Sequence, residues 1–267
     1  MTEMTLSGIN VLLTRPAAQS AALASAITGL GGNVCELPLI EIEPVTETDA
    51  CETIKSRILN LDHYYAAIFI STNAARMGMQ WIDRYWPQLP VGLSAYAVGP
   101  GTADVLKEFD WPVFVSDRGV TSEDLLALPG LRQVDGKKIA LFRGVGGREL
   151  LAETLRERGA AVDYLELYHR HTPDYSQDVL ADLIQDQHVN AIVVSSAQIL
   201  DVLLHLLHQD VAKLTTIPLI VPSERVRQRA LDAGIHIVIN AGGADESSVI
   251  KSLKAVAPVI KPTLQQR

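Results

Sequence analysis

Polar residues and glycines follow most of the short apolar runs of this chain, at points where a strand would end and a helix begin. In open parallel α/β sheets, ligands bind beyond the carboxyl ends of the strands. Helix starts also carry free backbone N–H groups and a positive dipole end, which favour carboxylate or phosphate. We therefore predict that an anionic substrate is bound by Arg15, Ser71, Thr72, Asn73, Gly101, Thr102, Arg143, Ser195, Ser196 and Ser223. Each hydroxyl residue among them can equally serve only as a helix N-cap.

Tyr168 is the candidate for acid–base chemistry. It stands near the end of an apolar run, where the chain is expected to pass from one domain to another. A phenol is protonated at neutral pH and can donate a hydrogen bond to a bound ligand. A lone tyrosine is more often a packing residue, so packing is the alternative role.

Several common kinds of active site are missing from the sequence. Segment 144–149 (GVGGRE) superficially resembles a dinucleotide-binding loop, but Glu149 stands where the third glycine would be. There is no Walker A sequence and no G-x-S-x-G motif. His169 with His171, and His205 with His208, have the spacing of paired ligands, yet no carboxylate or cysteine pattern accompanies them. We therefore predict no metal ion and no organic cofactor.

The elements that must position these residues are strands and helices that alternate along the chain. Apolar runs at 139–142 and up to about Tyr168 flank a helical pattern at 149–158 that Gly159 ends, which is a strand–helix–strand unit. Continued alternation predicts an α/β fold with mainly parallel, doubly wound sheets. One strand is expected over 34–42, and Pro38 and Pro44 indicate that it, or its end, is an edge strand or a linker.

Two stretches of the chain follow the same plan. Residues 8–42 resemble 139–170, with Arg15 matching Arg143 at an offset of 128 (143 − 15). AIFISTN at 67–73 also resembles AIVVSSA at 191–197, at an offset of 124 (191 − 67). We therefore predict an internal duplication of a unit of roughly 125 residues. The alternative is a chance likeness between two unrelated α/β units.

Length, charge and cysteine use limit the functional classes. The 267 residues allow one or two domains with proper cores, and Cys35 and Cys51 form no ligand or disulfide pattern. No apolar run approaches the length of a membrane span, and we expect no signal peptide. The net charge of −8, without a basic tract, argues against a nucleic-acid partner. We expect a cytoplasmic monomer with no membrane or nucleic-acid partner.

Segments from almost the whole chain resemble the uroporphyrinogen-III synthase family, in the family's order. They are VLLTRPAAQSAALASAITGLGGNVCELPLIEI, FISTNAA, AVGPGTADVL, RGVGGRELLAETLRERGAAVDYLELYHR and VVSSAQ. Each is weak alone, whereas the ordered set is specific. The resemblance implies two flavodoxin-like domains joined by a two-stranded linker. Domain 1 would comprise 1–38 plus 173–267, domain 2 would comprise 45–164, and the linker strands would be 39–44 and 165–172.

The resemblance also implies a reaction on a polycarboxylate tetrapyrrole, hydroxymethylbilane. Water leaves its terminal hydroxymethyl carbon, the last pyrrole of the resulting azafulvene is inverted through a spiro intermediate, and the ring closes as uroporphyrinogen III. The family uses no metal or organic cofactor, and its tyrosine matching Tyr168 is implied to assist departure of the hydroxyl. The eight substrate carboxylates suit the helix starts. Glu224, in the segment VPSE at 221–224, departs from the family and makes contacts from that loop doubtful.

Two alternatives remain open. A cofactor-free two-domain binding protein would close on a small anion without turnover, although the expected lack of an export signal counts against extracytoplasmic receptors. A nucleotide-using α/β enzyme would lack its phosphate loop. Supplying hydroxymethylbilane and resolving the cyclised isomers separates all three, because uncatalysed closure gives the type I isomer.

Overall fold

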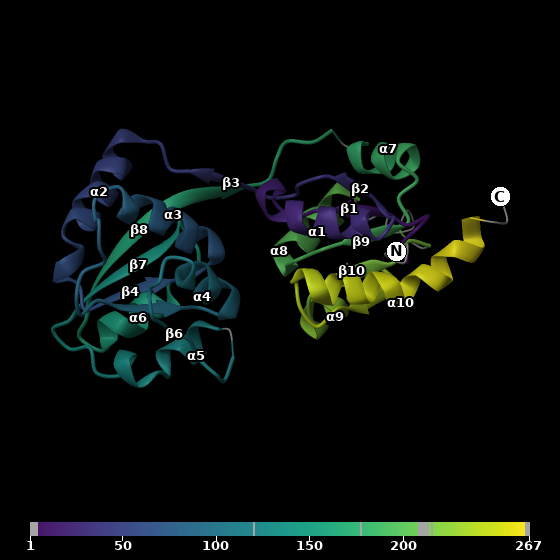
Figure 1. The fold of residues 1–267 in the computed structure, drawn as a ribbon. Coiled ribbons are helices and arrows are strands. Elements are labelled where there is room, and N and C mark those ends of the chain that lie inside the picture. Colours follow the sequence, from purple (N-terminus) through teal and green to yellow (C-terminus); the bar gives the residue numbers. More distant parts are fainter. Residues whose placement is uncertain (1–4, 120, 177, 208–213, 215, 265–267) are drawn as a thin grey trace. The chain divides into compact units, whose positions relative to one another are not determined.

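The computed structural model describes residues 5–119, 121–176, 178–207, 214 and 216–264. The chain folds as two compact units, whose elements are labelled in Figure 1. Unit 1 comprises Met1–Glu41 and His171–Arg267, and unit 2 comprises Ile42–Arg170. Among the described residues, no helix combines the length and apolar character that crossing a membrane requires.

Unit 1 is built on a five-stranded parallel sheet with the order β11-β10-β9-β1-β2. Its strands are β1 (Asn10–Leu13), β2 (Asn33–Glu36), β9 (Ala191–Val193), β10 (Leu219–Val221) and β11 (Val238–Asn240). The carboxyl ends of parallel strands meet at one edge of a sheet. The chain order therefore brings Arg15, Ser195 and Ser223 to the same edge of unit 1.

Helices cover the apolar strands of this sheet. The described helices of unit 1 are α1 (Ala17–Gly29), α7 (Val179–Asp186), α8 (Ala197–Leu206), α9 (Glu224–Asp232) and α10 (Glu246–Leu264). Helices α1 and α10 contact each other and share a core cluster with β1 that contains Leu13, Leu23 and Leu253 (Figure 1). Apolar residues about one helical turn apart, such as Leu23 and Ile27, give α1 its buried stripe.

Unit 2 is built on a six-stranded sheet with the order β3-β8-β7-β4-β5-β6. Its strands are β3 (Glu41–Pro44), β4 (Ala66–Phe69), β5 (Ser94–Ala97), β6 (Val113–Phe114), β7 (Lys138–Gly144) and β8 (Ala161–His171). The pairs from β8 through β6 are parallel. The carboxyl ends of β4, β5 and β7 therefore lie at one edge, where Ser71, Gly99 and Arg143 stand.

Both faces of the unit 2 sheet are covered. The helices are α2 (Thr48–Leu59), α3 (Thr72–Asp83), α4 (Pro100–Lys107), α5 (Ser122–Leu126) and α6 (Leu150–Glu157), with 3-10 turns at Leu61–His63 and Pro129–Leu131. Alternate β4 residues enter different cores, since Phe69 packs with α2, α3 and α4 while Ile68 packs with α5 and α6. Burial on both faces explains why β4 is an unbroken apolar run. The predicted α/β class with parallel, doubly wound sheets is confirmed.

The five strands of the unit 1 sheet have the same order as five of the six strands of the unit 2 sheet, with β3 as the additional strand. Reading β11-β10-β9-β1-β2 beside β6-β5-β4-β7-β8 pairs β1 with β7 and β9 with β4. These are the strands that the offsets of 128 and 124 relate. The match agrees with the predicted duplication, but a common origin of the two units stays a prediction.

The strand expected over 34–42 is two separate strands. Strand β2 ends at Glu36 in unit 1, and β3 begins at Glu41 in the sheet of unit 2. Pro38 falls in the break, and its neighbours Leu37 and Leu39 donate their N–H groups to the carbonyls of Leu13 and Thr14, both at 3.0 Å. The expectation of one strand was wrong because the apolar run continues beyond Glu36, where single backbone bonds to the end of β1 replace the β1–β2 ladder.

Candidate functional site

The hydroxyl groups of Tyr168 and Ser71 meet at the carboxyl edge of unit 2. Tyr168 lies in β8, only 2% of it is exposed, and its Oη is 2.9 Å from Ser71 Oγ. Ser71 is the N-cap of α3, where its Oγ accepts the N–H of Ala74 at 3.0 Å. A hydroxyl can accept two hydrogen bonds and donate one. Ser71 can therefore cap α3 and still donate its proton to the phenol oxygen.

Gly144 makes room for the Tyr168 ring. The β7–β8 ladder shifts register between Arg143 and Gly144, so that Gly144 stands opposite Tyr168. A Cβ atom on Gly144 would lie 2.6 Å from Tyr168 Cε2 and 2.8 Å from Cζ. Only a residue without a side chain fits beside the ring. Sequence reasoning missed this role because it took Gly144 as part of a turn.

We expect Gly144→Ala to lower the free energy of unfolding by about 1–3 kcal/mol, the usual range for overpacking a filled site. The methyl group would push the ring away and stretch the contact between Tyr168 and Ser71. Denaturant unfolding measures the loss, and Gly101→Ala is the stability control, because its Cβ would have no neighbour nearer than 3.8 Å. Equal stability of the two variants would mean that the ring moves without cost.

Arg143 is held inside unit 2. It is 1% exposed, and its Nη1 donates to Glu149 Oε1 at 2.9 Å while Nε donates to the Gly144 carbonyl at 3.3 Å. Its Nη2 donates to the Gly146 carbonyl, and the guanidinium lies 4.8 Å from the centre of the Tyr164 ring. The Tyr164 hydroxyl donates to Glu149, and this bond, followed by those from Arg143, lowers the pKa of that carboxyl. The positive charge of Arg143 thus has an internal counter-ion.

The other predicted residues of unit 2 lie in the first turns of two helices. Thr72 and Asn73 begin α3, and Gly101 and Thr102 lie near the start of α4. A Cβ on Gly101 would lie 3.8 Å from Thr72 Cγ2, so the two helix starts are neighbours. Thr102 is buried, whereas Gly101 is exposed. The structure therefore brings helix starts together at the edge that also holds Ser71.

In unit 1, two predicted serines cap helices at the carboxyl edge of the sheet. Ser196 Oγ accepts the N–H of Ile199 at 3.2 Å at the start of α8, and Ser223 Oγ accepts that of Val226 at 3.5 Å at the start of α9. Ser195 precedes the first of these caps and is partly buried. Ser71, Ser196 and Ser223 are therefore N-caps, and their contact with a substrate stays a prediction.

Arg15 follows β1 and is 8% exposed. Its Nη2 donates to the Ala244 carbonyl at 3.1 Å, and its buried Nε has no hydrogen-bond partner. Burial lowers the pKa of Arg15, and the charge of Asp245 partly opposes this. Asp245 itself accepts the N–H of Ser248 at 3.0 Å and the hydroxyls of Ser247 and Ser248 at 2.7 Å, which hold the pKa of its carboxyl far below its usual range.

His169 and His171 each have a carboxylate neighbour, which the sequence pattern did not indicate. His169 Nε2 is 3.0 Å from Glu47 Oε1 in unit 2, and His171 Nε2 is 3.0 Å from Glu41 Oε2 in unit 1. Both pairs are exposed, and each imidazole meets a different carboxylate. The expectation that no carboxylate accompanies them was wrong. His208 lies outside the described residues.

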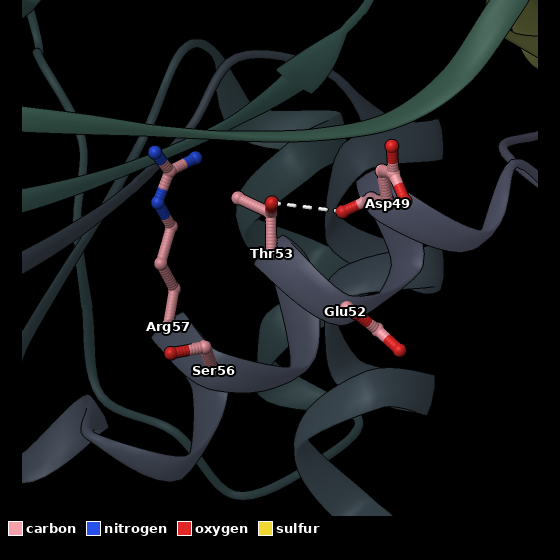
Figure 2. A pocket seen from close by; sticks show the side chains of 5 residues that line it. All are labelled: Asp49, Glu52, Thr53, Ser56 and Arg57. Atoms are coloured by element: carbon pink, nitrogen blue, oxygen red, sulfur yellow. Dashed lines mark hydrogen bonds between the residues drawn. The ribbon is translucent and has the colours of Figure 1, made fainter.

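A hollow along α2 contains none of the predicted site residues. Figure 2 shows its lining, which is Asp49, Glu52, Thr53, Ser56 and Arg57. The Thr53 hydroxyl donates to the Asp49 carbonyl at 2.8 Å, and Arg57 donates to the Tyr164 carbonyl. These side chains come from successive turns of one helix, α2. The hollow therefore offers no converging set of groups for chemistry.

Comparison with known proteins gives a family match over most of the chain. A family model described as uroporphyrinogen-III synthase HemD matches residues 21–251. The uroporphyrinogen-III synthase of Escherichia coli K12 is 31% identical over 250 residues, which cover 92% of this chain and 100% of that protein. The enzyme of the same name from Proteus mirabilis is 35% identical over 181 residues, 65% of this chain and 86% of that protein.

Solved structures show the same fold. A mutant uroporphyrinogen III synthase from Thermus thermophilus matches with a TM-score of 0.59 at 17% identity, covering 97% of this chain and 100% of the other. The uroporphyrinogen-III synthetase of Helicobacter pylori matches with a TM-score of 0.58 at 14% identity, covering 93% of this chain and 99% of the other.

Proposed function

The chain belongs to the uroporphyrinogen-III synthase family, and we propose that it cyclises hydroxymethylbilane to uroporphyrinogen III in haem biosynthesis. The reaction releases water and inverts the terminal pyrrole. The observation that carries the proposal is the family match over residues 21–251, together with the 31% identity that spans the whole E. coli relative.

Tyr168 is the proposed acid. As the pyrrole nitrogen pushes electrons towards the hydroxymethyl carbon, the C–O bond breaks and its electron pair stays on oxygen. The phenol proton passes to that oxygen, which leaves as water, and the phenolate faces the new azafulvenium cation. Ser71 would then donate to the phenolate oxygen at the present 2.9 Å separation, and the positive end of α3 favours the negative charge.

The substrate carboxylates are proposed to bind at the strand-end edge of each unit. In unit 2 the starts of α3 and α4, with Ser71, Thr72, Asn73, Gly101 and Thr102, offer backbone N–H groups and hydroxyls. In unit 1 the starts of α8 and α9 follow Ser195, Ser196 and Ser223. Arg143 has internal partners for its N–H groups, and its contact with substrate stays a prediction.

The setting of the reaction is also part of the proposal. We expect a cytoplasmic monomer that needs no metal, organic cofactor or nucleic-acid partner. The negative net charge of −8 supports the last point, because it disfavours a polyanionic partner. It also implies that a polycarboxylate substrate is held by local groups, since long-range attraction is absent.

The purified chain should convert hydroxymethylbilane, generated in place, mainly to the type III isomer. Oxidation of the products to porphyrins and separation of the isomers measures the ratio, and heat-inactivated protein is the control. Prior dialysis against a chelator should leave the ratio unchanged. Formation of the type I isomer alone would contradict the proposal and favour the alternative of a binding protein without turnover.

A further inference from the structure

Arg15 is a buried cation that forms no ion pair with any residue the structure describes. Among the described residues, no carboxylate forms an ion pair with it, and its only hydrogen-bond acceptor is the Ala244 carbonyl at 3.1 Å. Its Nε is buried and has no partner. Burying a charge is costly unless it is paired, and an unpaired buried donor adds to that cost. We infer that Arg15 is the cationic part of a carboxylate subsite on unit 1, which rests on the proposed function for the identity of the ligand.

Arg143, the corresponding arginine of unit 2, differs from Arg15 because it has an ion-pair partner. Each arginine stands at the carboxyl end of the corresponding strand of its unit, β1 for Arg15 and β7 for Arg143, and the two are related by an offset of 128 (143 − 15). Arg143 has Glu149, but the same offset puts Ala21 at the corresponding position (149 − 128 = 21). One unit therefore supplies an internal carboxylate to its strand-end arginine, whereas the other has an alanine at that position, so a ligand would have to supply the carboxylate.

The surroundings of Arg15 suit an anion. It stands at the carboxyl edge of the unit 1 sheet, against the loop that leads into the 19-residue helix α10. The charge of Asp245 acts on Arg15, but the Asp245 carboxylate already accepts hydrogen bonds from the N–H of Ser248 and from the hydroxyls of Ser247 and Ser248. A guanidinium can bind a carboxylate through two parallel N–H···O bonds. An acetate or propionate side chain of the tetrapyrrole is the matching ligand.

This role predicts an unusual combination of effects for Arg15→Met. Removing an uncompensated buried charge and filling its place with an apolar chain should leave the melting temperature equal to or above that of the wild type. Binding of uroporphyrinogen III, measured by anaerobic titration calorimetry, should weaken by roughly 10- to 100-fold through loss of a charge-assisted contact. Arg143→Met is the matched control and should lower the melting temperature.

The outcomes separate the inference from the proposed function. Arg15→Gln is measured beside Arg15→Met, so that the test survives if one variant fails to fold. A lowered melting temperature of the folded variants, or unchanged affinity, overturns the subsite even if the wild type makes the type III isomer. If the wild type makes only the type I isomer, the proposed function fails, and the melting temperatures alone decide whether Arg15 is an uncompensated cation.

Discussion

Replacing Tyr168 with phenylalanine is expected to slow formation of uroporphyrinogen III by about 10²- to 10⁴-fold, the usual contribution of a positioned general acid. The leaving hydroxyl would lose the proton that the phenol supplies as the C–O bond breaks. The reaction should not stop, because the pyrrole nitrogen still expels the hydroxyl slowly without help. Initial rates of type III product, at matched protein concentration, measure the effect.

The phenylalanine variant is the appropriate test because the ring is buried. With 2% of Tyr168 exposed, packing is the competing explanation, and the variant keeps the ring against Gly144 while removing only the hydroxyl. Tyr65→Phe is the matched control, since it removes a hydroxyl that bonds the Gly130 carbonyl in the same unit at 3.2 Å. A Tyr168→Phe enzyme as fast as the wild type would show that Tyr168 only packs.

The alternation of strands and helices was predictable because each element of a doubly wound sheet has a strong local pattern. The strand before Ser71 is buried on both faces and therefore reads as a continuous apolar run. The apolar pattern is less informative where the structure depends on which strands pair, because apolar character alone does not determine pairing. Residues 37–40 are as apolar as a strand, yet they join two sheets, and no periodicity reports which strand a segment will pair with.

The candidate site was predictable only in its location. Strand ends placed the serines correctly, but the contact between Ser71 and Tyr168 joins residues 97 positions apart, and sequence spacing cannot report it. The space for the Tyr168 ring depends on a register shift at Gly144, which is a property of the β7–β8 ladder. The difference between the two arginines, in contrast, is visible in the residues themselves. The two similar segments align Glu149 with Ala21, so that only Arg143 has a carboxylate at this position of its own unit.

Arg143→Met is expected to lower the free energy of unfolding by about 3 kcal/mol, because hydrogen bonds to charged groups are typically worth about 1.5–3 kcal/mol each and several are lost together. The carbonyls of Gly144 and Gly146 lose a donor, and Tyr164 loses the cation above its ring. Glu149 is 45% exposed, so its freed carboxylate can be rehydrated, and the cost stays below that of a fully buried orphan charge. Denaturant unfolding measures the change.

The double variant Arg143→Met with Glu149→Gln tests whether the ion pair itself matters. If the carboxylate stabilises unit 2 mainly through Arg143, Glu149→Gln should cost much less in the Arg143→Met background than in the wild type. Equal costs would mean that the two residues act independently.

The same Arg143→Met change should also disturb the segment 144–147, and with it the position of Gly144 beside the Tyr168 ring. We therefore expect a secondary loss of type III activity, and its absence would place the role of Arg143 in stability alone.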